Sequence, residues 1–77
     1  MAYMAQQWLA TAARDAFQDR ADALDQAAEA ARVRGWLASL PLDRGTVAML
    51  VEPIAALEDG LRQAARDATR RVERSAP

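Results

Sequence analysis

Apolar residues recur along the first half of the chain at the three- and four-residue spacing of an amphipathic helix. Residues 5–34 contain no glycine or proline, and they are rich in alanine, which has the highest intrinsic helix propensity. The apolar positions that set this spacing are Leu9, Ala13, Ala16, Phe17, Leu24, Ala27, Ala28 and Ala31. The pattern predicts one long helix over residues 5–34.

Residues that stop and start helices separate this segment from a second one. Gly35 interrupts the first pattern, and Pro41 steers the residue before it away from helical angles. Asp43 or Thr46 then provides an N-cap, because a side-chain oxygen there can accept a hydrogen bond from the first turn. Helical spacing resumes from Val47 to Val72.

Pro53 falls inside this second pattern, where a proline removes one hydrogen bond and clashes with the preceding turn. We therefore predict a short helix over residues 43–51 and a longer helix over residues 53–74, with a continuous but kinked helix as the alternative. Residues 75–77 are expected to form a frayed tail.

A short connection between two long helices favours an antiparallel pair, so the predicted fold is an all-α hairpin with a short helix in its connection. Pairing residues whose numbers sum to about 85 sets Leu24 against Leu61, Phe17 against Ala68, Ala31 against Ile54 and Ala13 against Val72. Half of the apolar residues are alanines, 20 in all, so few bulky side chains remain for a core, and much of the burial is expected from Phe17, Leu24, Ile54, Leu57 and Leu61. A second copy or a partner is therefore expected to complete it.

The composition argues against catalysis. The chain has no cysteine and no histidine, which removes thiolate chemistry, the commonest general base and the commonest metal ligand. No glycine-rich phosphate loop is present. We expect no enzyme activity, no cofactor and no metal site.

Charge and hydropathy narrow the expected partners and location. The net charge is −1 and the isoelectric point is about 5.2, so nucleic acid is not the expected ligand. No apolar run approaches the roughly 20 residues of a membrane span, and the first residues do not resemble a signal peptide. We expect a cytoplasmic protein with a protein partner.

The carboxylates of the first helix fall on the side away from its apolar stripe. They are Asp15, Asp19, Asp22, Asp25 and Glu29. One interpretation is a solvated helix face, and the other is an acidic ridge offered to a basic partner.

Met4 and Trp8 lie on the same side as these carboxylates and are candidate partner contacts, since tryptophan is enriched at binding hot spots. The alternative is that this end is frayed or covered by the chain itself. Val33, Trp36 and Leu37 either cap the core beneath the connection or form a second exposed patch.

Arginines repeat every four residues along the last helix. They are Arg62, Arg66, Arg70 and Arg74. Favourable pairs of Glu58 with Arg62 and of Asp67 with Arg71, together with the helix dipole, account for much of this row. The alternative is contact with phosphate or with an acidic partner.

The predicted function is a non-enzymatic protein–protein interaction module, such as an adaptor, a small chaperone or an inhibitor, acting through the acidic and Trp–Met face. One alternative is a phage or mobile-element inhibitor that blocks a basic nucleic-acid-binding groove of a host complex. Another is an obligate oligomer or an accessory structural subunit of a larger complex.

Overall fold

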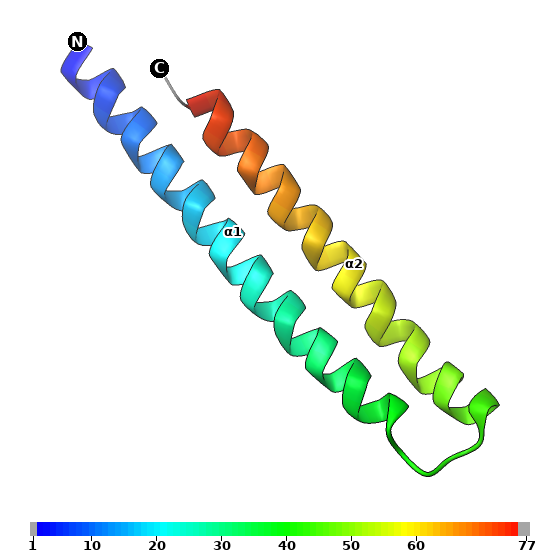
Figure 1. Ribbon diagram of the computed structural model, residues 1–77. Helices are drawn as coiled ribbons and strands as arrows, with labels where there is room; N and C mark the ends of the chain where they lie inside the picture. Colours follow the sequence, from blue (N-terminus) through cyan, green and yellow to red (C-terminus); the bar gives the residue numbers. More distant parts are fainter. Residues whose placement is uncertain (1, 76–77) are drawn as a thin grey trace.

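Two long antiparallel helices make up the computed structural model (Figure 1). Helix α1 spans Ala2–Ala38 and helix α2 spans Arg44–Ser75. The structure describes the backbone of residues 2–75 and the side chains of Trp8 and residues 10–74. No strand occurs in this range, and the rod measures 64 × 13 × 12 Å. The predicted all-α hairpin is confirmed.

Helix α1 continues through Gly35, one turn past the predicted end. A glycine in a helix costs only about 1 kcal/mol, which the flanking helix formers can offset. The helix ends in a tighter turn, where the Ser39 amide and hydroxyl both donate to the Trp36 carbonyl at 3.1 and 2.7 Å. Pro41 follows, so the helix stops where the sequence pattern forbids its continuation.

Asp43 is the N-cap of α2, and it is one of the two residues predicted for this position. Its carboxylate accepts hydrogen bonds from the Thr46 backbone amide at 3.1 Å and from the Thr46 hydroxyl at 2.7 Å. The Asp43 carbonyl accepts from the amide of Val47 at 3.0 Å, which closes the first turn. The Thr46 hydroxyl is the main reason that the pKa of Asp43 lies below its ordinary value, and the Thr46 amide adds to the effect.

The separate short helix predicted over residues 43–51 is wrong, because this segment and residues 53–74 form the single helix α2 with Pro53 inside it. Pro53 is exposed, so water can satisfy the carbonyl that loses its partner. Its neighbours Val51 and Ile54 are half-buried, which favours continuing the helix. Ser75 ends α2, and the rest of the predicted tail lies outside the described residues.

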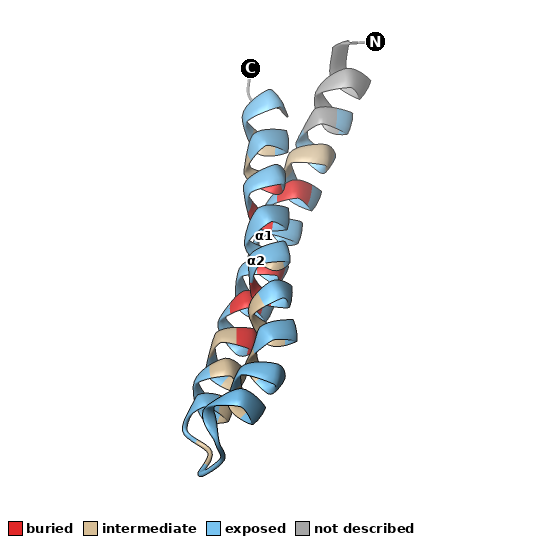
Figure 2. Cartoon of the chain, turned by 90° about the vertical axis from the view of Figure 1, so that its right-hand side faces the viewer, coloured by how far each residue is buried: buried red, intermediate tan, exposed pale blue. Residues whose placement is uncertain are grey.

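A narrow seam between the helices contains the buried residues (Figure 2). They are Ala16, Ala23, Ala27, Ala30, Glu58, Ala65 and Ala68. Several are seven residues apart, the spacing that keeps one side of a helix against a neighbour over many turns. Small alanines let the two backbones approach closely. No large side chain among the described residues is fully buried.

The predicted core membership of Phe17, Leu24 and Leu57 is wrong, since all three are about half exposed. The seam uses Ala16 and Ala23 instead, each one position earlier on α1. Two helices share only one seam, and alanines there draw the backbones together and leave the bulky side chains beside it.

The helices are also shifted relative to the predicted pairing. Ion pairs cross the seam between Arg34 and Glu58 at 3.1 Å and between Asp19 and Arg71 at 3.0 Å, so residue numbers of facing pairs sum to about 90. Leu24 consequently lies beside Ala65, and Leu61 does not face it.

Candidate functional site

The seam leaves two long flanks open, because a hairpin has no third helix to cover them. We call the first the groove flank, which is lined by Gln26, Glu29, Ala30 and Val33 of α1 and by Ile54, Leu57 and Leu61 of α2. We call the second the arginine flank, which is lined by Arg20 and Leu24 of α1 and by Arg62, Ala65, Arg66 and Thr69 of α2. On a helix with 100° per residue, these two sets lie on opposite sides of the seam.

The groove flank contains an open hollow of about 220 Å³ with an aliphatic floor. Val33, Ile54 and Leu61 are half-buried there, and Leu57 is 53% exposed. Leu50, seven residues before Leu57, is also exposed and extends the strip toward the connection. The result is a strip of aliphatic side chains at helical spacing that the described part of the chain covers only in part.

A line of residues seven apart runs along the α1 edge of this groove. It consists of Trp8, Asp15, Asp22, Glu29 and Trp36. Seven residues make nearly two full turns, so these side chains follow one edge of the helix. Glu29 lines the groove, and the other four residues continue the same edge of α1 toward the two ends of the rod. We call it the acidic edge, and its two tryptophans are 71% and 63% exposed.

Most of the predicted partner-binding residues fall on this flank. Asp19 reaches across the seam to Arg71, and Asp22 accepts a hydrogen bond of 2.9 Å from Gln18. Glu29 pairs with Arg32 on its own helix. Asp25 is exposed and lies further round the outer face of α1, away from the groove. The side chain of Met4 lies outside the described residues.

Sequence reasoning missed Trp36 as a companion of Trp8. It left Trp36 open between core and surface, and the structure places it at the surface. The signal was available in the chain, because Trp36 follows Glu29 by seven residues. The aliphatic strip was missed for another reason, namely that Leu57 and Leu61 were assigned to the core.

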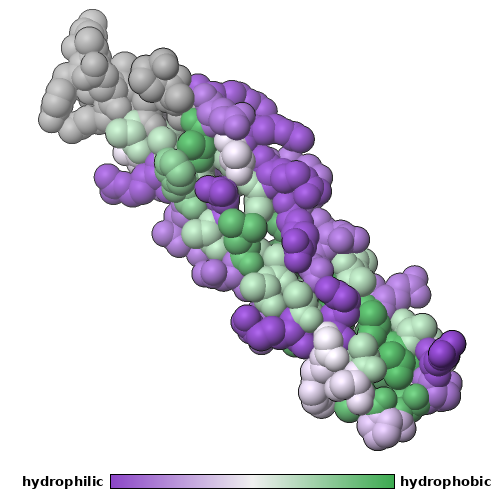
Figure 3. All heavy atoms as spheres, in the orientation of Figure 1, coloured by the Kyte–Doolittle hydropathy of each residue, from purple (hydrophilic) through white to green (hydrophobic). Residues whose placement is uncertain are grey.

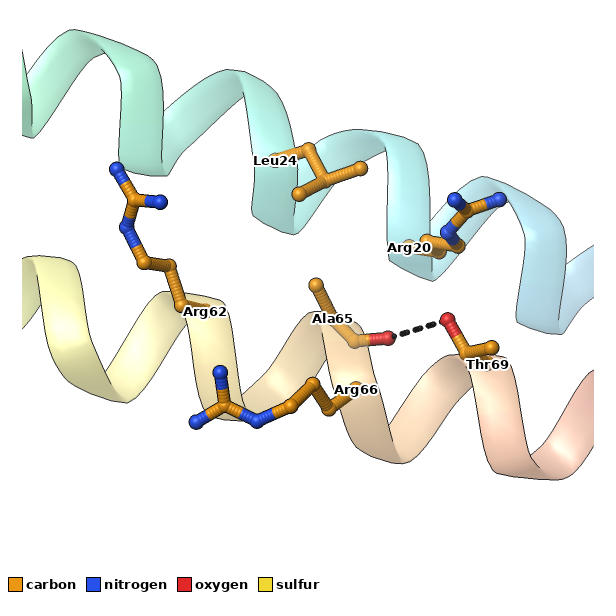
Figure 4. Close-up of a pocket in the computed structure, with 6 residues that line it drawn as sticks. All are labelled: Arg20, Leu24, Arg62, Ala65, Arg66 and Thr69. Carbon is orange, nitrogen blue, oxygen red and sulfur yellow. Dashed lines mark hydrogen bonds between the residues drawn. The ribbon is translucent and has the colours of Figure 1, made fainter.

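The arginine flank contains a hollow of about 240 Å³ with polar walls (Figure 4). Buried Glu58 accepts hydrogen bonds from Arg34 Nε at 3.3 Å and from Arg34 Nη2 at 3.1 Å. Arg62 approaches the other carboxylate oxygen of Glu58 at 3.6 Å, which confirms the predicted Glu58–Arg62 pair. Arg66 donates to the side-chain oxygen of Gln63 at 2.7 Å. Most polar groups here have partners within the chain.

The predicted arginine row does not form one strip. A four-residue step advances about 40° around a helix, so Arg62 and Arg66 line the hollow while Arg70 and Arg74 turn away from it. Arg70 pairs with Asp67 at 3.1 Å. The predicted Asp67–Arg71 pair stays a prediction, and Arg71 forms an ion pair of 3.0 Å with Asp19 on the other helix.

The space-filling view separates the surface into zones. In Figure 3 hydrophilic residues cover much of the C-terminal half of α2, while hydrophobic residues gather along the middle of the rod and at the end that holds the connection. We call that end, residues 39–43, the tip. The side chains thus become more apolar toward the tip.

Other site types find little support in the described part of the chain. Over this range no three His, Cys, Asp or Glu side chains group so that they could hold a metal ion. Within the same residues, neither helix is apolar enough along a sufficient length to cross a bilayer. No protein-family model matches the sequence, and the searches of curated proteins and of solved structures returned no match.

Proposed function

We propose that the protein is a non-enzymatic interaction module whose groove flank binds an amphipathic helix with a basic edge. The observation that carries this proposal is the aliphatic strip lying directly beside the acidic edge. An adaptor, a small chaperone or an inhibitor would each use such a surface, because each acts by occupying part of another protein.

Helix-in-groove binding is the recognition mode that suits this geometry. Two helices packed side by side leave a long furrow, and a third helix can lay apolar residues spaced three, four and seven apart into it. Val33, Ile54, Leu57 and Leu61 provide apolar contacts along one stretch of the furrow. Each fully covered leucine or isoleucine contributes about 1.5–3 kcal/mol, so a few of them can hold a partner.

The acidic edge defines the charge of the partner. Asp15, Asp22 and Glu29 are exposed along the rim, where lysines or arginines of a bound helix would face them. Exposed charge pairs add little affinity, but they speed up encounter and reject acidic partners. The tryptophans at both ends of the edge add large apolar contacts of the kind found at binding hot spots.

A synthetic pair of peptides tests this proposal. One is an amphipathic helix of leucine and lysine, and the other has the same pattern with glutamate in place of lysine. Titration of the diluted protein into each fluorescently labelled peptide should raise the anisotropy of the lysine peptide only. Leu57→Glu should weaken this binding at least tenfold, because it places a charge in the strip. Leu24→Glu, a similarly exposed leucine on the arginine flank, is the matched control and should bind as the natural chain does.

Equal binding of both peptides, or binding that Leu57→Glu leaves unchanged, would show that the groove flank does not select a basic amphipathic helix. The predicted alternative of an inhibitor that blocks a basic nucleic-acid-binding groove uses the same carboxylates, and their alignment at seven-residue spacing favours it. It differs in one respect, since it needs the acidic edge but not Leu57. Competition with a nucleic acid that survives Leu57→Glu would select this second function.

A further inference from the structure

We propose that the helix bound in the groove is α2 of a second copy of this chain, and that two hairpins associate with both tips at the same end as a four-helix bundle. This inference rests on the proposed function, because it names the amphipathic helix that the groove flank accepts. Four observations carry it.

The single hairpin leaves too much surface uncovered for its size. A compact monomer of 8.4 kDa exposes about 4,600 Å², whereas this chain exposes 5925 Å². The excess, about 1,300 Å² for one chain, is more than the roughly 800 Å² that each partner buries in a standard protein–protein interface. Among the described residues only alanines and Glu58 are buried, so the bulky apolar side chains still lack a covering layer.

Helix α2 itself matches the partner that the groove requires. Leu50, Ile54, Leu57 and Leu61 provide an apolar stripe at three-, four- and seven-residue spacing. Arg71, two heptads after Leu57, lies on the same edge of the helix, where it is paired with Asp19 of its own chain.

The distribution of residues along the rod fixes the relative direction of the two copies. The groove lies in the half nearer the tip, between residues 26–33 and 54–61, and Asp15 lies in the other half. With both tips at the same end, the aliphatic strips of the two copies meet each other along the same stretch of the rod. With tips at opposite ends, Leu57 would lie among carboxylates and lose its apolar cover.

The arginine flank also exposes an apolar side chain, Leu24, but it is the less favourable surface for a second copy. Glu58 already satisfies Arg34 and Arg62 there, so docking would have to strip water from a completed polar cluster. Docking of the groove flank of one copy on the arginine flank of the next would also give a ring or an open filament of many copies, and not a closed pair. Groove on groove gives a closed pair around a twofold axis parallel to the helices.

Sedimentation equilibrium of the full chain tests the association. The natural protein should have twice the 8.4 kDa mass of one chain, and dilution should dissociate it. Leu57→Glu should sediment as a single chain, and circular dichroism should show that its helices remain. The matched control Leu24→Glu should remain paired.

The direction of the copies is tested with a nitroxide label on Leu42→Cys, the only cysteine in that variant. Leu42 lies in the connection, so labels on two copies with adjacent tips should be about 20–25 Å apart, roughly two helix diameters. Tips at opposite ends would instead give a separation near the 64 Å length of the rod. Pulsed electron–electron double resonance measures the distance between the two labels, and the longer distance would overturn the inference.

Failure here can be told apart from failure of the proposed function. A chain that stays monomeric at every concentration but still binds the lysine peptide overturns the second copy and leaves the proposed function intact. A monomer that binds neither peptide removes both. Assemblies larger than two chains, or pairing lost in Leu24→Glu but not in Leu57→Glu, contradict the closed groove-on-groove pair.

Discussion

The two flanks of this hairpin border the same seam. They differ in how far the chain itself pairs their charged groups and covers their apolar side chains. On the arginine flank, Arg34 and Arg62 converge on buried Glu58, so the buried carboxylate is paired within the chain. On the groove flank, Leu57 is 53% exposed and the carboxylates of the acidic edge border it. One flank pairs its buried carboxylate within the chain although Leu24 stays exposed there, and the other exposes a longer aliphatic strip beside carboxylates.

This difference shows where recognition is encoded in an alanine-rich hairpin. The seam alanines set the distance between the backbones, but an alanine side chain offers little area and no directional contact. Residues one position to either side of the seam decide what each flank can bind. The same fold could therefore present two groove flanks or none with few substitutions.

The largest effect is expected at the seam, on which both flanks depend. Ala68 is completely buried against α1, so Ala68→Leu should force the helices apart and lower the free energy of unfolding by about 1–3 kcal/mol or more. Ala64→Leu, one turn earlier and exposed, is the control and should change it by less than about 0.5 kcal/mol. Urea unfolding followed by circular dichroism measures both. Equal effects would show that the seam is not close-packed at Ala68.

A smaller effect on the free energy of unfolding is expected from the two cross-helix ion pairs, one on each flank, and its size should differ between them. Glu58→Ala removes a buried carboxylate with three hydrogen-bond contacts to Arg34, and should cost about 1–2 kcal/mol, since both arginines remain accessible to water. Asp19→Ala breaks the exposed pair with Arg71 and should cost at most about 0.5 kcal/mol. A double-mutant cycle at each pair gives the two coupling energies. If they are equal, the arginine flank is no better completed than the groove flank.

The fold was largely predictable from the sequence, because helix propensity and apolar spacing are local properties. The alanine-rich segment before Gly35 and the cap at Asp43 needed no knowledge of the partner helix. The sequence did not decide whether the helix continues through Pro53, because this depends on whether the carbonyl that loses its hydrogen bond to the proline reaches water. That is a property of the folded surface.

The candidate site was only partly predictable. The outward position of the acids followed from the helical wheel, and all five are exposed. Phe17 and Leu24 were misplaced because bulky residues were assumed to fill the core, whereas alanines occupy it. A rotation by one residue position, about 100°, is enough to exchange seam and flank. Single-sequence periodicity does not fix that rotation when alanines lie on several sides of a helix.

Glycines outside the seam offer a way to raise stability without touching either flank. A Cβ at Gly35 or Gly60 would meet no atom within 4 Å, so alanine there should add about 0.5–1 kcal/mol each. At Gly45 the added carbon would lie 3.3 Å from the Asp43 carboxylate, which should reduce or cancel the gain. Thermal unfolding measures all three. A stabilised Gly60→Ala chain that binds the lysine peptide as before would separate docking from stability.

The smallest effect is expected at the tip, which belongs to neither flank. The pKa of Asp43 is held below 3.8, chiefly by the Thr46 hydroxyl, so the charged carboxylate is favoured in the folded state. The cap should therefore contribute fully above pH 3.8 and be lost as the pH falls through the lowered value. Amide exchange at Thr46 and Val47 should accelerate in that range, before exchange in the middle of the seam does.

Asp43→Asn isolates this titration, because its amide oxygen can still accept from the Thr46 backbone but does not ionise. Its exchange rates at Thr46 and Val47 should respond to acid less than those of the natural chain. The effect must be small, since Asp43 is fully exposed and water competes for its oxygens. Acid sensitivity that persists unchanged in Asp43→Asn would place its origin in another carboxylate.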